Sequence, residues 1–196
     1  MICWAPPPLK PLCAVYPSQG SNMLVHLTTV YPISSFQVSP PAVPTINEVL
    51  KRSSRGTTLK KYWHVQGIRR MISDAYSYGK SEQFSNCFEI NGYLARLSFK
   101  VERFNGKTWL GLYFGICWSE NDKYLSWPFR TPYTVTIIHP SVNARSVSDK
   151  VSEFTSTNFR NFKRPKDWYN QTWGFPELLS LGDAENQGFI SDDGVS

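Results

Sequence analysis

Two apolar stretches joined by a turn, within residues 92–129, constrain the fold more than any other part of the chain. From residue 93 to residue 101 every second side chain is apolar or aromatic, and most of the residues between them are polar. Because strand side chains alternate between two faces, this pattern predicts a half-buried β-strand. Asn105 and Gly106 follow, and both residue types tolerate positive φ, so we predict a tight turn there.

The stretch after the turn, from Trp109 to Trp118, is almost entirely apolar. It is too short to span a membrane, and a strand covered on both faces has this composition. A polar tight turn at residues 119–122 and an aromatic corner at residues 127–129 come next. A second alternating run, from Tyr133 to Ile138, adds another strand. Together these features predict an all-β protein with an antiparallel β-sandwich.

Two polar segments are expected to be loops, one from residue 71 to 85 and one from 140 to 157. We predict short strands at residues 85–90, near residue 174 and, at the start of the chain, from Asn22 to Tyr31. Residues 1–44 hold nine of the 14 prolines and no acidic residue. Since proline disfavours both helix and sheet, we expect residues 1–57 to be a largely disordered extension and residues 58–196 to be the folded domain.

Charge and cysteine content narrow the class of protein. Four scattered cysteines without CxxC spacing indicate neither a zinc site nor a disulfide framework, and no cofactor is expected. The first 15 residues lack the charge pattern of a signal peptide, and no apolar run is long enough for a membrane helix, so we predict a cytoplasmic protein. The sequence contains no hydrolase elbow, P-loop or zinc-protease motif, which argues against an enzyme.

A series of short motifs, in order and at consistent spacings, resembles the MATH domain, and more narrowly the C-terminal domain of TNF-receptor-associated factors. These motifs are Gly92-Tyr93, Asn105-Gly106, the strand with Leu110, Leu112, Tyr113 and Phe114, Asn121-Asp122, Trp127-Pro128-Phe129, Phe162 to Pro165, Gly174-x-Pro176 and Asp192-Asp193.

The resemblance implies a sandwich of seven to eight strands. It identifies residues 60–68 as the entry strand, with Trp63 and Val65 toward the core and His64 outward. The family follows its acidic pair with one more apolar strand, which is missing here. Either the sequence is a fragment, or another segment such as Asn22 to Tyr31 fills the gap.

The resemblance also implies a peptide-binding groove for extended segments of receptor tails or signalling proteins, in an adaptor role. The family's groove aromatics correspond to Tyr113 and Phe162, and its groove glycine to Gly174. Its peptide-reading arginine and tyrosine correspond to Ser98 and Lys100, and its run of serines to residues 159–161. The predicted site residues are Ser98, Lys100, Tyr113, Phe159, Arg160, Phe162, Trp173 and Gly174.

The loss of the family's arginine, together with Lys100 and Arg160, predicts a preference for acidic peptides with apolar anchors. Two alternatives stay open. One is a truncated or diverged MATH fragment that binds no peptide. The other, less favoured, is a nucleic-acid-associated protein, because residues 51–70 carry seven of the 21 basic residues and no acid. No heptad repeat supports a trimeric coiled coil, so a monomer or weak oligomer is expected.

Overall fold

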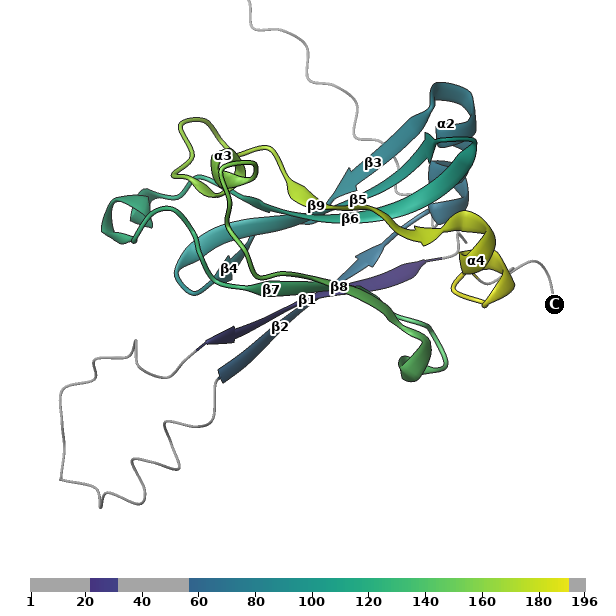
Figure 1. Ribbon diagram of the computed structural model, residues 1–196, viewed down its shortest axis with the longest axis horizontal. Helices are drawn as coiled ribbons and strands as arrows, with labels where there is room; N and C mark the ends of the chain where they lie inside the picture. The colour runs from purple at the N-terminus through teal and green to yellow at the C-terminus, as the bar shows by residue number, and fades with distance from the viewer. Residues whose placement is uncertain (1–21, 32–56, 191–196) are drawn as a thin grey trace, which may run out of the picture.

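Two antiparallel β-sheets face each other in the computed structural model, which describes residues 22–31 and 57–190 (Figure 1). Sheet A has the strand order β2 (Thr57–Val65), β1 (Met23–Tyr31), β7 (Tyr133–Ile137) and β8 (Val147–Val151). Sheet B has the order β3 (Lys80–Phe84), β5 (Tyr93–Phe104), β6 (Lys107–Ile116) and β9 (Trp173–Ser180), and β4 (Phe88–Ile90) also pairs with β5. The predicted all-β sandwich is confirmed, with nine strands in the described residues instead of seven to eight.

Strand β1 lies inside sheet A, where it pairs with β2 on one side and with β7 on the other. Val25 stands opposite Trp63 of β2 and Ile137 of β7. Met23, Val25 and Leu27 are buried against the core. The prediction that this segment forms a strand and fills a position in the sandwich is therefore confirmed. The rest of the proline-rich region, residues 1–21 and 32–56, and the acidic pair at 192–193 lie outside the described residues.

The hairpin formed by β5 and β6 is the centre of sheet B, and the alternation in the sequence predicts its faces correctly. The five apolar residues of the run all lie in the core: Tyr93, Ala95, Leu97, Phe99 and Val101. Asn105 and Gly106 adopt φ values of 50° and 75°, as the turn requires. Because β6 is buried on both faces along nearly its whole length, its continuous apolar run is explained.

An aromatic cluster fills one end of the space between the sheets. The rings of Phe114 and Tyr133 lie 4.6 Å apart between centroids, and those of Phe114 and Phe129 lie 5.4 Å apart. Phe162 joins from the C-terminal half of the chain, with its ring 6.2 Å from that of Phe129. The aromatic corner that the sequence predicts is thus part of the core, because Phe129 is fully buried.

Residues 71–85, predicted to be a loop, instead form most of helix α2 (Ile68–Tyr78) and strand β3. Ile68, Met71 and Ala75 lie on one buried face of α2, and glycines with positive φ flank both ends of the helix. The second predicted loop, residues 140–157, contains the short helix η3 (Asn143–Arg145) and strand β8. The predicted entry strand is confirmed as β2, with Val65 buried and His64 exposed.

The shorter helices lie at opposite ends of the sandwich. Helix α4 (Leu181–Asn186) lies at the same end as α2, whereas α3 (Phe159–Phe162) lies at the other end (Figure 1). The predicted polar turn after β6 is a 3-10 helix, η2 (Glu120–Tyr124), which the Ser119 side chain caps. None of the helices in residues 22–31 and 57–190 is long and apolar enough to cross a membrane.

Candidate functional site

The outer face of sheet B brings several of the predicted site residues together in one row. Ser98 of β5 stands opposite Tyr113 of β6, and Tyr113 stands opposite Gly174 of β9. The neighbours of Ser98 on β5 and of Tyr113 on β6 point into the core. Because side chains alternate along a strand, this row faces away from the core. Phe84 of β3 extends the row on the far side of Ser98. Four strands therefore contribute to one continuous surface.

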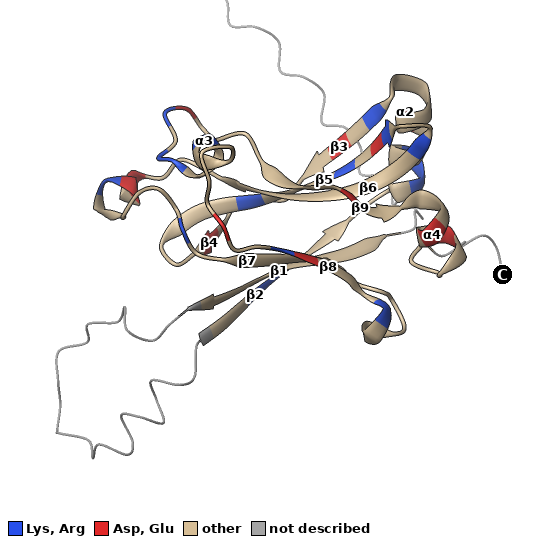
Figure 2. Ribbon diagram, viewed as in Figure 1, with Lys and Arg blue, Asp and Glu red and all other residues tan. Residues whose placement is uncertain are grey.

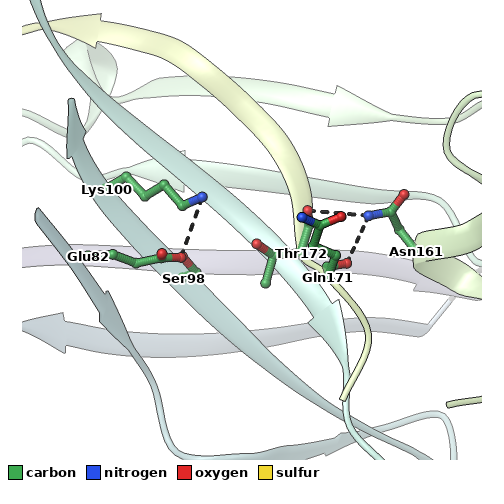
Figure 3. Close-up of polar contacts among 6 residues, drawn as sticks. All are labelled: Glu82, Ser98, Lys100, Asn161, Gln171 and Thr172. Atoms are coloured by element: carbon green, nitrogen blue, oxygen red, sulfur yellow. Dashed lines mark hydrogen bonds and ion pairs between the residues drawn. The ribbon is translucent and has the colours of Figure 1, made fainter. Parts of the chain in front are cut away.

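A small polar group surrounds the start of this row (Figure 3). The Ser98 hydroxyl donates a hydrogen bond to Oε1 of Glu82, and Nζ of Lys100 lies 3.6 Å from the same oxygen. The Lys100 ammonium also lies 4.5 Å from the centroid of the Tyr113 ring. The positive charge of Lys100 is therefore partly balanced by the Glu82 carboxylate. Glu82 was not predicted as a site residue, because its segment was expected to be a loop.

The Tyr113 side chain is nearly buried, with 9% of its surface exposed. Burial raises the pKa of Tyr113 to about 12, and the nearby Glu102 and Glu82 carboxylates add to this effect. The phenol is thus neutral at physiological pH and retains its hydrogen as a donor. The ring lies across Gly111, where an added Cβ would stand 2.9 Å from Cε2 of Tyr113.

Gly174 allows β9 to approach β6 more closely than any other residue would. A Cβ at this position would stand 2.6 Å from Cα of Tyr113, which is backbone and cannot move aside cheaply. Trp173, the preceding residue, is half-buried and packs against the core. Its carbonyl accepts a hydrogen bond of 3.2 Å from the Tyr133 hydroxyl.

Helix α3 places its predicted site residues in two different environments. Phe159 is 46% exposed, and Arg160 is also exposed. Phe162 is fully buried, with its ring 5.0 Å from that of Phe154. Ser98 is likewise 0% exposed. In this structure neither Phe162 nor Ser98 is accessible to a peptide on the surface, which corrects the prediction that Phe162 walls the groove.

Two asparagines hold α3 to the segment that enters β9. Nδ2 of Asn161 donates to the carbonyls of Gln171 at 2.9 Å and Thr172 at 3.4 Å (Figure 3). Nδ2 of Asn170 donates to the carbonyl of Lys163 at 2.6 Å. These hydrogen bonds from side-chain amides fix the position of Phe159 and Arg160 beside sheet B. Side-chain bonds to backbone carbonyls leave no periodic signal in a sequence, so this bracing was not predictable.

The described residues hold no group of three or more histidine, cysteine, aspartate or glutamate side chains positioned to hold a metal ion. The arrangement is instead a surface of aromatic, basic and small residues on the outer face of a sheet, with an edge strand beside it. Surfaces of this kind recognise other proteins.

The TRAF/meprin MATH domain family model matches residues 80–196 of this chain, which is more than half of its length. The match begins at β3 and includes every element of sheet B, whereas β1, β2 and α2 precede it. The chain therefore belongs to the TRAF/meprin MATH domain family, whose domains mediate protein interactions.

Proposed function

We propose that this domain binds short extended peptides from receptor tails or signalling proteins, in the cytoplasm and in an adaptor role of the TRAF type. The observation that carries the proposal is the pairing of Tyr113 with Gly174 of β9, at the outer edge of sheet B. Within the described residues, β9 is the last strand of this sheet and pairs in it only with β6. Its other edge offers backbone donors and acceptors to an added strand.

The side chains along this edge suit an extended peptide with apolar anchors. Phe159 offers exposed aromatic surface, whereas Trp173 packs against the core. The ring of Tyr113 lies beside the Lys100 ammonium on the outer face. Arg160 contributes a positive charge at the α3 side. Glu82 pairs with Lys100, so an acidic peptide group has to compete with that carboxylate. We therefore expect Lys100 to contribute less to the preference for acidic peptides than its charge alone suggests.

The test is a fluorescence titration of the protein with matched acidic and neutral peptides. We expect saturable binding, and we expect the double variant Lys100→Ala/Arg160→Ala to bind the acidic peptides several-fold more weakly. The matched control is Arg145→Ala/Lys150→Ala, which removes one arginine and one lysine at exposed positions on η3 and β8. The absence of saturable binding would favour the alternative of a MATH domain without peptide binding. Equal weakening in both double variants would contradict the proposed location.

The distribution of charge supports the nucleic-acid alternative less well than it supports peptide binding. Basic residues lie on and near α2 and the β5–β6 turn, but acidic residues lie on α4 at the same end of the molecule (Figure 2). Arg103 and Lys107 line a hollow that they share with Asp183 and Glu185. A nucleic-acid surface concentrates positive charge, whereas here carboxylates are interspersed with it.

A further inference from the structure

Arg96 lies on the same outward face of β5 as Ser98 and Lys100, since the three residues alternate along one strand. Its guanidinium carbon is 4.0 Å from the centroid of the Phe84 ring and 3.7 Å from that of the Tyr169 ring. One ring comes from edge strand β3 and the other from the segment between α3 and β9. The guanidinium group is therefore held by aromatic stacking from two separate parts of the chain.

Stacking on two rings does not itself supply a hydrogen-bond acceptor to this arginine. Nε of Arg96 is buried and has no hydrogen-bond acceptor among the described residues, and no aspartate or glutamate in that part of the chain forms an ion pair with the group. Aromatic rings satisfy the face of a guanidinium but not its N–H groups, which lie in its plane. An acceptor with two oxygens would satisfy the two terminal nitrogens in a bidentate manner.

Two exposed aromatic side chains, Phe84 and Tyr169, contact Arg96. Trp118 and Trp168 instead adjoin the paired residues Cys117 and Tyr169 and face the other side of that pairing. Phe84 is 45% exposed and Tyr169 is 53% exposed, and Trp118 and Trp168 are 41% and 78% exposed. The two tryptophan rings meet edge to face with centroids 6.2 Å apart, and the Trp118 amide donates to the Trp168 carbonyl at 2.9 Å. Together with Lys166 and Asp167 they line a hollow of about 310 Å³. Exposed aromatic rings on an arginine that forms no ion pair within the described residues are typical of a binding surface.

We propose that Arg96 binds the carboxylate of an aspartate or glutamate in the peptide, and that an adjacent apolar side chain of the same peptide packs on the exposed rings of Phe84 and Tyr169. This inference rests on the proposed function and assigns the acidic specificity within it. Arg96 precedes Lys100 by four residues, or about 13 Å along an extended strand. The acidic residue of the peptide thus binds Arg96 and not Lys100. The two aromatic rings already fix the orientation of the Arg96 side chain before the peptide binds.

The experiment uses fluorescein-labelled ten-residue peptides in matched pairs, with glutamate or glutamine at one position between apolar residues. Fluorescence anisotropy measures the affinity of each pair for the full chain and for Arg96→Lys, which retains the charge but loses the planar fork. We expect the variant to lose at least tenfold of the preference for glutamate over glutamine. Arg145→Lys, at an exposed position on η3, is the matched control and leaves that preference unchanged.

Further variants separate the parts of the proposal. Arg96→Gln is expected to abolish the glutamate preference, and circular dichroism and the melting temperature verify that both Arg96 variants are folded. The double variant Lys100→Ala/Arg160→Ala is expected to weaken binding of the acidic peptides several-fold and to lose less of the glutamate preference than the Arg96 variants do.

The outcomes distinguish this inference from the function on which it rests. If no peptide of the set binds the unmodified chain, both fail. If peptides bind and Lys100→Ala/Arg160→Ala weakens them, but the Arg96 variants retain the full glutamate preference, the proposed function stands and the role of Arg96 is refuted. A third arm with phosphoserine at the same position tests the ligand: binding of the phosphopeptide alone would overturn the assignment to a carboxylate.

Discussion

Replacing Leu27 by alanine is expected to lower the free energy of unfolding by about 3 kcal/mol. Leu27 lies on β1, and its side chain is fully buried against the core. Removing a buried leucine side chain beyond Cβ costs both the transfer free energy of the lost atoms and the energy of the cavity that remains, in total roughly 2–5 kcal/mol. In a domain of this size the expected decrease in melting temperature is roughly 6–12 °C.

The matched control is Thr28→Val, at the next position of the same strand. Thr28 faces the opposite side of sheet A and is only half-buried, and valine retains the β-branched shape that suits a strand. We expect this variant to change stability by no more than about 0.5 kcal/mol. The contrast between neighbouring positions tests whether β1 is inserted in the register that the structure shows, in which Leu27 stands opposite Val135.

Urea unfolding followed by tryptophan fluorescence provides the measurement, and the midpoints and slopes of the three proteins are compared. A lower midpoint with an unchanged slope for Leu27→Ala is the expected result. Equal midpoints for Leu27→Ala and Thr28→Val would show that β1 does not bury its inward face in the sandwich. That result would refute the central place of β1 in sheet A.

Three further predictions concern sheet B. Gly174→Ala should cost more than about 2 kcal/mol in the same urea assay, because its Cβ would meet backbone of β6, whereas Gly182→Ala, with open space around it, should not destabilise. The raised pKa of Tyr113, about 12 against an ordinary value of 10, means that its stabilising contribution is complete below pH 10 and is lost between pH 10 and 12. Between pH 10 and 12 the free energy of unfolding of the unmodified protein should therefore fall by up to roughly 3 kcal/mol more than that of Tyr113→Phe. Parallel stability profiles of the two proteins would contradict the raised pKa of Tyr113. Burial, followed by the hydrogen bond with Cys87 at a sulfur–sulfur distance of 2.7 Å, raises the pKa of Cys117 to about 12. Iodoacetamide at pH 8 should accordingly alkylate the exposed Cys87 well before Cys117, as peptide mass spectrometry would show, and equal labelling would exclude a buried Cys117.

Local periodicity was sufficient to predict the strands with strong alternation. The run from residue 93 to 101 and the turn at Asn105 and Gly106 match the structure residue by residue. Helix α2 was missed because its exposed faces are rich in serine and tyrosine and conceal its apolar face. The spacing of Ile68, Met71 and Ala75, between two glycines, was the signal that would have identified it.

Strand β8 was missed for a different reason. It is an edge strand with only Val147 and Val151 directed toward the core, and three polar residues stand between them. A strand with so little buried surface resembles a loop in sequence. Its position is determined by pairing with β7, which is a long-range contact that no local pattern reports.

The candidate site was predictable only where family motifs determine the strand register. Tyr113 and Gly174, which the resemblance assigns to one site, lie on strands with recognisable motifs and stand opposite each other. Phe162 was misjudged, since an aromatic residue in a helix of one turn can point to the core or to solvent with the same sequence. Glu82 and the two rings around Arg96 come from segments far apart in the chain, and their approach depends on the tertiary fold.

The match to the family starts at β3, yet sheet A depends on two strands that lie before it. A recombinant protein trimmed to residues 80–196 would retain all of sheet B but only β7 and β8 of the opposing layer. The inner surface of sheet B would then be bare over the area that β1 and β2 cover, and β7 would present an unprotected edge. Such a truncated product should precipitate or associate through that edge, so soluble samples for crystallisation or NMR need to begin upstream of Met23.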